Sequence, residues 1–387
     1  MIPGASVELL ARLVAFPTVS RTPNLALIEM VRARLEASGA RTVVIPAADG
    51  TRANLFASVG PHTDGGVMLS GHTDVVPVEG QAWTVPPFAL TSRDGRHYGR
   101  GTADMKGFVA AAVACVEQAA SQPLRAPLHL ALSFDEEIGC VGVRSLIDML
   151  ATAPYRPRFC IVGEPTGMGI ATGHKGKVAL RARFRGREAH SALAPTGLNA
   201  LHLAADFVQD LRSLQLELEC HGPRDGDYDV PYTTVHVGTL GGGTALNIVP
   251  NSAAADFEIR NVASDDPDAI LARLEAVSAA RLHSLRETFP EAAVEIEQVN
   301  SYPGLATPPD AEIVDFMRAL TGVNKTHKVA FGTEGGLFSA RLGLPVVVCG
   351  PGSMAQGHKP DEFVSDEQMK RCDAVLEKLV ARLRDGF

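Results

Sequence analysis

The sequence predicts an α/β fold, a mainly parallel sheet with helices on both faces, carrying a smaller inserted α+β domain. Three observations support this prediction. Segments with helical spacing of apolar residues alternate with strand-like segments in the first part of the chain. Several strand candidates are short and almost wholly apolar, as is typical of strands buried on both faces. After Gly176 the predicted strands alternate apolar and polar residues, and near residue 304 the alternation of helices and apolar strands resumes.

The larger domain is expected to begin with helices and to continue as an alternation of buried strands and helices. The run 67–70 is mostly apolar, and 105–119 is rich in alanine, which favours a helix. The predicted helices are 6–15, 24–38 and 105–119, and the predicted strands are 41–45, 54–58, 67–70, 128–134 and 159–162.

The inserted domain is predicted from the order strand, helix, two strands, helix, strand, which is the ferredoxin-like pattern. Its elements are expected at 178–185, 199–214, 233–240, 253–260, 266–285 and 292–299. A helix at 311–320, a strand at 345–348 and a helix at 366–384 then restore the α/β character. We therefore expect a discontinuous domain of residues 1–177 and 304–387, interrupted by an inserted domain of residues 178–303.

Composition limits the classes of partner. The 387 residues include 36 basic and 44 acidic side chains, a net charge of −8, which disfavours nucleic acid because phosphate binding needs a basic surface. No apolar run approaches the roughly 20 residues that span a bilayer. The six cysteines form no CxxC pair, and the first residues lack the pattern of a secretory signal. These features predict a cytoplasmic protein with reduced thiols and without a membrane partner.

Five possible metal ligands lie at breaks in the predicted elements. Each follows a strand-like run or precedes a helix. In an open parallel sheet, ligands bind beyond the carboxyl ends of the strands. Imidazole and carboxylate together suit zinc, so the set predicts a shared metal pocket. The five residues are His72, Asp104, Glu137, Glu164 and His358.

Each ligand also has an ordinary structural interpretation. His72 alone is compatible with a strand-end histidine bonded to backbone; two residues later, Asp74 lies on the same side of an extended segment and is expected to orient its ring. Asp104 opens a helix, so it is compatible with an N-cap, a bridge between two metal ions, or both.

Three consecutive acids, Asp135, Glu136 and Glu137, directly follow a buried strand. On a surface loop such a run would simply be solvated. Apolar flanking residues instead indicate burial, where nearby cations would relieve the repulsion. One carboxylate can then bind metal while its neighbour acts as a general base.

Together these motifs make the chain resemble the di-zinc amidohydrolase family, which includes acetylornithine deacetylases, succinyl-diaminopimelate desuccinylases, aminoacylases and glutamate-releasing carboxypeptidases. The resemblance covers nearly the whole chain, and two C-terminal motifs look most like the acetylornithine deacetylases. The motifs are Gly71–Asp74, Gly99–Gly107, Asp135–Gly139, Gly163–Pro165, Gly332–Phe338 and Cys349–Ser353 with His358–Phe363.

The resemblance implies roles position by position. Asp104 would bridge two zinc ions, which cobalt may replace; His72 and Glu164 would complete one site, and Glu137 and His358 the other. Glu136 would be the general base, and Asp74 would support His72. The inserted domain would form a homodimer and carry the remaining matches, which are His190 at a partner's active site and Asn247 and Arg260 at the substrate.

The implied substrate is a small N-acyl amino acid, foremost N2-acetyl-L-ornithine, which would be converted to L-ornithine and acetate in arginine biosynthesis. We hypothesise that Glu334 offers a negative charge to the distal ammonium; the alternative is a helix-start acid near the macrodipole. Gly352, in the turn that precedes His358, is a candidate for backbone contact with substrate. A desuccinylase, a carboxypeptidase or dipeptidase of the same architecture, and a non-catalytic binding relative remain as alternatives.

Overall fold

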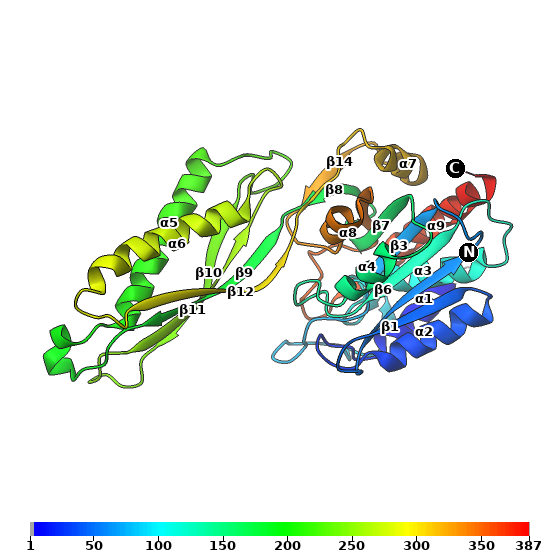
Figure 1. Cartoon of the computed structure of the whole chain (residues 1–387). Helices are drawn as coiled ribbons and strands as arrows, with labels where there is room; N and C mark the ends of the chain where they lie inside the picture. Colours follow the sequence, from blue (N-terminus) through cyan, green and yellow to red (C-terminus); the bar gives the residue numbers. More distant parts are fainter. Residues whose placement is uncertain (1–3, 387) are drawn as a thin grey trace. The chain divides into compact units, whose positions relative to one another are not determined.

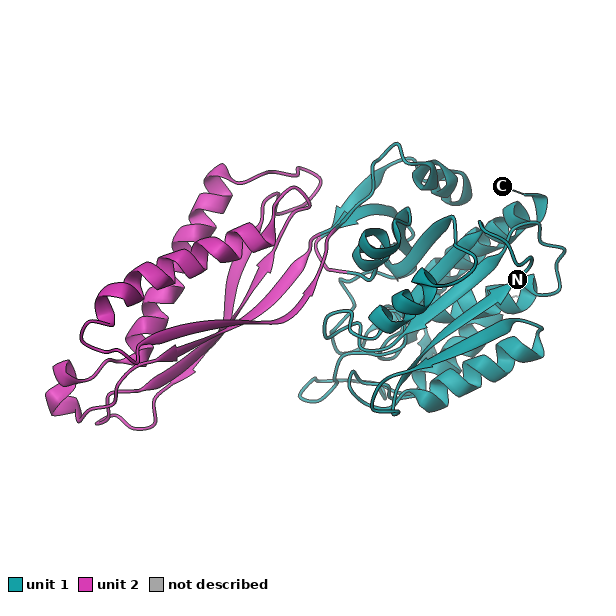
Figure 2. Ribbon diagram, in the orientation of Figure 1, with its two compact units in different colours: residues 1–174, 305–329, 333–387 teal, residues 175–304, 330–332 magenta. Residues whose placement is uncertain are grey.

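The computed structural model describes residues 4–386 and divides the chain into two compact units. Figure 2 shows the first unit, residues 1–174, 305–329 and 333–387, and the second, residues 175–304 and 330–332. The short segment 330–332 joins the second unit because Gly332 lies directly against the ring of Tyr302. A Cβ atom at Gly332 would lie 2.1 Å from the Tyr302 hydroxyl oxygen.

The first unit is built on a nine-stranded mixed sheet in the order β1-β2-β6-β3-β7-β15-β8-β13, with β14 paired to β8 (Figure 1). The four central strands β6, β3, β7 and β15 run parallel, whereas β1, β2 and β13 pair antiparallel. The predicted α/β sheet with a parallel core is confirmed. The strands are β1 (Arg41–Pro46), β2 (Ala53–Val59), β3 (Val67–His72), β6 (Leu128–Ser133), β7 (Phe159–Pro165), β8 (Ile170–His174), β13 (Leu305–Ala306), β14 (Thr326–Val329) and β15 (Val346–Gly350).

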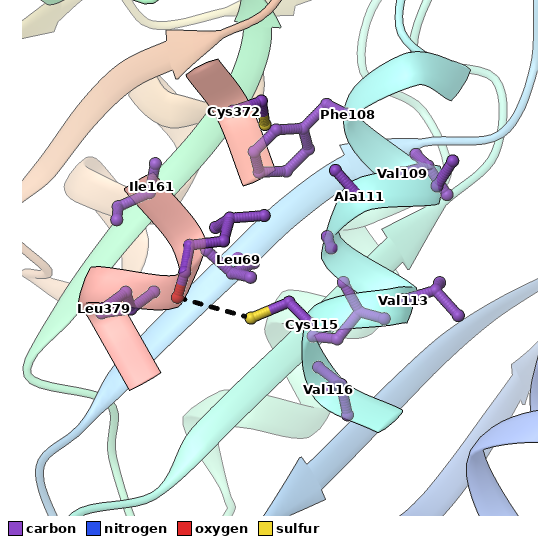
Figure 3. Close-up of a cluster of buried hydrophobic side chains, with 14 of the residues drawn as sticks. Leu69, Phe108, Val109, Ala111, Val113, Cys115, Val116, Ile161, Cys372 and Leu379 are labelled. Carbon is purple, nitrogen blue, oxygen red and sulfur yellow. Dashed lines mark hydrogen bonds between the residues drawn. The ribbon is translucent and has the colours of Figure 1, made fainter. Parts of the chain in front are cut away.

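Helices cover both faces of this sheet. The alanine-rich α3 (Lys106–Ala119) packs on the central strands and against α9 (Asp366–Asp385), and its small side chains permit this close approach. Figure 3 shows this core, in which the Cys115 thiol donates to the Leu376 carbonyl oxygen at 3.8 Å. The other helices are α1 (Ala5–Val14), α2 (Leu25–Ala37), α4 (Val143–Ala151), α7 (Glu312–Thr321) and α8 (Gly335–Leu342).

Several elements were not predicted from the sequence. Helix α8 and strands β8, β13 and β14 are short, and short elements give little periodicity. Helix α4 is also short but strongly amphipathic, so its apolar spacing was a signal that could have revealed it. A separate three-stranded sheet also joins segments far apart in the chain, namely β4 (Thr91–Arg93), β5 (Arg96–Tyr98) and β16 (Phe363–Ser365).

The second unit is a four-stranded antiparallel sheet in the order β10-β11-β9-β12, with two helices packed on one face. Its element order is ferredoxin-like. Strand β9 alternates buried and more exposed residues, because only one of its faces is covered. The elements are β9 (Lys177–Arg185), α5 (Ala200–His221), β10 (Thr234–Gly242), β11 (Ser252–Arg260), α6 (Pro267–Leu285) and β12 (Ala293–Tyr302), with a 3₁₀ helix at Ser191–Thr196.

Candidate metal centre

The five predicted ligands converge at one edge of the nine-stranded sheet. His72 is the last residue of β3, Glu164 lies near the end of β7, and Glu137 follows β6. Asp104 precedes α3, and His358 lies in the loop after β15. Because β6, β3, β7 and β15 are parallel, their carboxyl ends meet on the same edge.

Asp104 is the centre of the group, because its two oxygens face different histidines. Oδ1 lies 3.1 Å from Nε2 of His72, and Oδ2 lies 3.0 Å from Nε2 of His358. A glutamate oxygen accompanies each histidine. Glu164 lies 3.5 Å from Nε2 of His72, and Glu137 lies 3.0 Å from Nε2 of His358. The arrangement therefore provides two sets of one imidazole and one carboxylate that share Asp104.

Asp104 does not cap the helix with its side chain. The N-cap of α3 is Met105, which makes no side-chain capping bond. The two oxygens of Asp104 are thus committed to the histidines, and of the two interpretations left open by the sequence only the bridge has a geometric basis.

Burial makes this group costly without cations. Burial and the charge of Asp104 raise the pKa of Glu164 well above its usual range and that of Glu137 to about 7. Burial disfavours the charged form of His72, but Glu164 and Asp104 outweigh it and raise the pKa of the imidazole. Oε1 of Glu137 is buried and has no hydrogen-bond partner among the described residues. The residues therefore fit two divalent cations with oxygen and nitrogen ligands.

The three consecutive acids point to different partners. Asp135 accepts hydrogen bonds from the guanidinium of Arg52 and, at 2.7 Å, from the backbone N–H of Arg21. Glu137 faces His358. Glu136 accepts from the thiol of Cys140 at 3.2 Å, and its carboxylate lies in a potential ligand group with His72 and Glu164. Burial, with the nearby charges of Glu137 and Glu334, raises the pKa of Glu136 well above its usual range.

Asp74 is placed differently from the prediction. Nδ1 of His72 lies 2.9 Å from the backbone carbonyl oxygen of Asp74, but 3.6 Å from its carboxylate. That carboxylate instead accepts from the backbone N–H groups of Glu136 at 3.0 Å and Glu137 at 3.4 Å. The backbone of Asp74 therefore orients His72, while its side chain holds the loop with the other two acids.

The Arg100–Glu362 pair beside Asp104 was not identified in the sequence. Both side chains are 1% exposed, and Arg100 donates to Glu362 at 2.6 Å. The other oxygen of Glu362 accepts from the backbone N–H groups of Ala103 at 2.9 Å and Asp104 at 3.1 Å. Glu362 thus fixes the turn that presents Asp104. Its position in the motif after His358 was visible, but nothing in its local sequence indicated burial.

Glu334 lies in a place that does not fit a direct contact with substrate. The residue is 1% exposed, one carboxylate oxygen accepts from the hydroxyl of Ser70 at 3.2 Å, and the other accepts from Ser133. Burial raises the pKa of this carboxyl to about 7. Ser70 belongs to β3 and Ser133 to β6, so Glu334 ties together two strands that lead to the metal ligands.

In the second unit, His190 and Asn247 lie together in a pair of exposed segments. His190 forms an isolated bridge with Ile248, and the backbone N–H of Ser191 donates to the carbonyl oxygen of Asn247 at 3.0 Å. Nδ1 of His190 accepts from the backbone N–H of Ala192 at 3.1 Å. A neutral His190 therefore carries its proton on Nε2, which points a donor away from the chain's own backbone.

Arg260 lies far from that pair. It ends β11, whereas Asn247 precedes the first residue of the same strand, Ser252. At about 3.3 Å per residue, the strand alone separates its ends by roughly 26 Å. Arg260 donates to Glu258 and to the Tyr302 hydroxyl, both at 3.0 Å. One chain therefore does not bring His190 and Arg260 to a single site.

Gly352 makes a close backbone approach beside Asp104. Its φ is +83°, and an added Cβ atom would lie 3.1 Å from the Cβ atom of Ala103. Both facts favour glycine at this position. The turn can therefore lie directly against the segment that presents Asp104.

Comparison with known proteins agrees with this geometry. Residues 68–382 match the peptidase family M20/M25/M40. An acetylornithine deacetylase of Myxococcus xanthus is 36% identical over 97% of both chains, and relatives of the same name from Pasteurella and Salmonella are 33% and 32% identical.

Two solved structures show the same fold. An aminopeptidase from Bacillus cereus has a TM-score of 0.74 at 18% identity and covers 98% of both chains. A Bacillus subtilis protein described as a dinuclear metal-binding peptidase has a TM-score of 0.69 at 14% identity, with 99% of this chain and 98% of that one covered.

Proposed function

The chain belongs to peptidase family M20/M25/M40, and from that membership we propose that it hydrolyses N2-acetyl-L-ornithine to L-ornithine and acetate. It is a metal-dependent amidohydrolase. The single observation that carries the proposal is the placement of two histidine–glutamate sets on the two oxygens of Asp104. A binding relative that had lost catalysis would not be expected to retain all five ligands and an adjacent buried carboxylate, Glu136.

Two zinc ions are the proposed cofactors, with cobalt as a substitute. His72, Asp104 and Glu164 would hold one, and Asp104, Glu137 and His358 the other. When bound, the ions supply Lewis acidity that makes water nucleophilic near neutral pH and polarises the acyl carbonyl.

Glu136 is the proposed proton carrier. Its carboxylate accepts the proton of the attacking water and then donates that proton to the leaving amine of ornithine. The thiol of Cys140, 3.2 Å from one Glu136 oxygen, leaves the other oxygen to reach the water.

His190 is proposed to donate a hydrogen bond to the acyl oxygen in the active site of a partner chain. Two observations support this assignment. Nε2 carries the proton in the neutral ring, and His190 lies at the opposite end of β11 from Arg260. A homodimer formed through the second unit would let one chain supply His190 to the other.

Arg260 and Gly352 are the proposed contacts with the amino-acid part of the substrate, whereas Asn247, which lies beside His190, is proposed to reach the carbonyl region in the partner's active site. A guanidinium suits an α-carboxylate because it offers two parallel donors. Tyr302 and Glu258 hold the Arg260 fork in one orientation. Gly352 would contribute backbone groups close to Asp104.

We propose a positioning role for Glu334 in place of direct contact with the ammonium. Its buried carboxyl group joins Ser70, two residues before His72, to Ser133, which precedes the acidic loop. It therefore influences specificity only through the ligands that these strands present.

The direct test is a panel of N-acyl amino acids assayed with the zinc-loaded and cobalt-loaded enzyme. We expect the highest kcat/KM for N2-acetyl-L-ornithine, lower values for neutral acetylated amino acids, and little activity on N-succinyl-L,L-diaminopimelate. Higher kcat/KM for a dipeptide would assign the chain to the peptidases of its family, whose members include the solved structures above.

Cellular context follows from the proposed reaction. The product L-ornithine would feed arginine biosynthesis, and a cytoplasmic site is expected. Among residues 4–386, no helix has both the length and the apolar character that crossing a bilayer requires. All six cysteines are unpaired, and only Cys220 is exposed.

A further inference from the structure

His358 is much more exposed than the other four candidate metal ligands. Its side chain is 44% exposed, whereas those of His72, Asp104, Glu137 and Glu164 are between 1% and 7% exposed. The residue lies in the loop between β15 and β16, and its φ is +61°, a conformation that residues other than glycine rarely adopt. Other contacts must therefore hold this part of the loop if the His358 ring is to stay beside Asp104.

The two histidine ligands are held in different ways. Nδ1 of His72 lies 2.9 Å from the backbone carbonyl oxygen of Asp74, so a contact with the ring itself orients this ligand. For His358, the contact is made with the backbone. Nε2 of Gln81, in the loop between β3 and β4, donates to the His358 carbonyl oxygen at 2.9 Å. Gln81 therefore restrains the residue that carries the ring.

The orientation of the Gln81 amide is determined by its neighbours. Its Oε1 accepts from the guanidinium of Arg100 at 2.5 Å and from the indole Nε1 of Trp83 at 3.0 Å. Both of these groups can only donate hydrogen bonds. A flipped amide would place its NH₂ group against two donors and its oxygen against a carbonyl oxygen. The donor of Gln81 is therefore directed at His358.

The support of Gln81 is itself part of the metal centre. Arg100 is buried and donates to Glu362 at 2.6 Å as well as to Gln81. Glu362 in turn accepts from the backbone N–H of Asp104 at 3.1 Å. One buried ion pair thus connects the shared ligand Asp104 with the side chain that restrains His358.

A second contact joins the same two loops independently of Gln81. The backbone N–H and the hydroxyl of Thr84 donate to the two carboxylate oxygens of Asp361 at 2.9 Å and 2.7 Å. Because this contact lies three residues beyond His358, it can keep the loops together when the Gln81 amide is removed. Loss of the amide should therefore release His358 without unfolding the loop.

We propose that Gln81 is a positioning residue for His358 and that it selectively strengthens metal binding by Glu137 and His358. This role rests on the proposed metal centre but not on the choice of substrate. Contacts that orient a metal ligand typically contribute about 10–100-fold to metal affinity. His72 and Glu164 belong to β3 and β7 and are held by the sheet, so their ion should be little affected.

The test is a calorimetric titration of metal-free, full-length protein with zinc chloride. Wild type is expected to bind two ions per chain. Gln81→Met keeps the length of the side chain but cannot donate to His358, so one ion should bind with wild-type affinity and the other about 10–100-fold more weakly. Gln81→Glu should show the same selective loss, because it turns a second oxygen toward the His358 carbonyl. Glu79→Gln, at an exposed residue of the same loop, is the matched control and should bind both ions normally.

Substitution of the ligands identifies which ion is weakened. In a His358→Ala background, Gln81→Met should not change the affinity of the remaining ion, because the ligand that Gln81 positions is gone. In a His72→Ala background, Gln81→Met should weaken the remaining ion by about 10–100-fold. Excess zinc should restore kcat for N2-acetyl-L-ornithine in Gln81→Met with KM unchanged, whereas damage to the fold would not be reversed by zinc.

Three results would overturn the positioning role of Gln81 and leave the metal centre intact. They are equal zinc affinities in wild type and Gln81→Met, equal weakening of both ions, and the same loss in the His358→Ala and His72→Ala backgrounds. Wild-type protein that binds fewer than two zinc ions would overturn the proposed metal centre as well.

Discussion

The candidate functional residues are buried and close together in the first unit, whereas in the second unit they are more exposed and lie at opposite ends of a strand. In the first unit, His72, Asp104 and Glu164 are at most 5% exposed and lie within a few ångströms of one another. In the second unit, His190 and Asn247 are exposed and Arg260 is partly exposed at the other end of a strand.

This difference in burial determines whether the structure of one chain indicates that a site binds a ligand. Buried like charges must be compensated, so the crowded carboxylates of the first unit indicate cations by their own energetics. The exposed polar side chains of the second unit remain solvated and lose little free energy of hydration, so their placement by itself implies no ligand. The proposed role of His190 needs a partner chain, whereas all the metal-binding residues belong to the first unit.

The largest expected effect is on Glu136. Glu136→Gln should lower kcat by about 10²–10⁴-fold, the usual contribution of a general base, while both metal ions are retained. Steady-state kinetics and metal analysis of the purified variant measure the two quantities. Glu287→Gln, at an exposed carboxylate of the second unit, is the control. A metal-loaded Glu136→Gln enzyme with near wild-type kcat would show that Glu136 is not the general base.

His190→Ala tests the opposite region. Because His190 is exposed, the free energy of unfolding should change by less than about 0.5 kcal/mol. Loss of an oxyanion donor should nevertheless reduce kcat by about 10²–10³-fold.

Mixing the two inactive variants asks whether His190 acts across a dimer. If Glu136→Gln and His190→Ala chains exchange freely, mixed dimers contain one intact site, and about a quarter of the wild-type activity should return. No recovery despite demonstrated subunit exchange would show that His190 serves its own chain.

Glu334 provides a pH-dependent test of the buried region. Its pKa in the fold is raised to about 7, so the unfolded chain loses this proton first as the pH rises. Stability is therefore full below the ordinary glutamate pKa and falls between roughly pH 4.5 and 7, by up to about 3 kcal/mol. Denaturant titrations of metal-free protein should show this fall in wild type and a shallower one in Glu334→Gln. Identical slopes would mean that the carboxyl is not desolvated.

The positioning role of Glu334 needs a separate readout. Glu334→Gln keeps a hydrogen-bonding group between Ser70 and Ser133, whereas Glu334→Leu does not. We expect Glu334→Leu to lower the affinity for metal and to lower kcat by the same factor for N2-acetyl-L-ornithine and for a neutral acetylated amino acid. In Glu334→Gln, much of the metal affinity and of kcat should be retained. A loss confined to acetylornithine would instead support direct contact with the ammonium.

The smallest expected effect is on substrate binding by Arg260. Arg260→Lys keeps the charge but loses the parallel donors and the contacts with Glu258 and Tyr302. KM should rise about tenfold with kcat less affected, as expected for one charge-assisted contact. Arg181→Lys is the matched control, since Arg181 lies on the neighbouring strand and pairs with Asp256. An equal KM in both variants would exclude Arg260 from the site.

Much of the fold was predictable because its longer elements carry strong periodicity. The apolar run at β3 and the alanine-rich α3 are visible in the residues themselves. Helix α5 continues to His221, beyond the predicted residue 214, because the more polar final turns weaken the apolar pattern. Glu362 and the serine contacts of Glu334 were not predictable, since both depend on residues more than 200 positions apart.

By itself, the sequence determined the α/β alternation, the inserted ferredoxin-like order and the residue types that suit a pair of metal ions. These features are local, because periodicity and ligand chemistry are properties of short segments. Only the tertiary structure decided which oxygen of Asp104 faces which histidine, that Asp74 orients His72 through its backbone, and that Glu334 is buried. These arrangements depend on the parallel order of β6, β3, β7 and β15, which brings distant segments together at one edge and removes them from water.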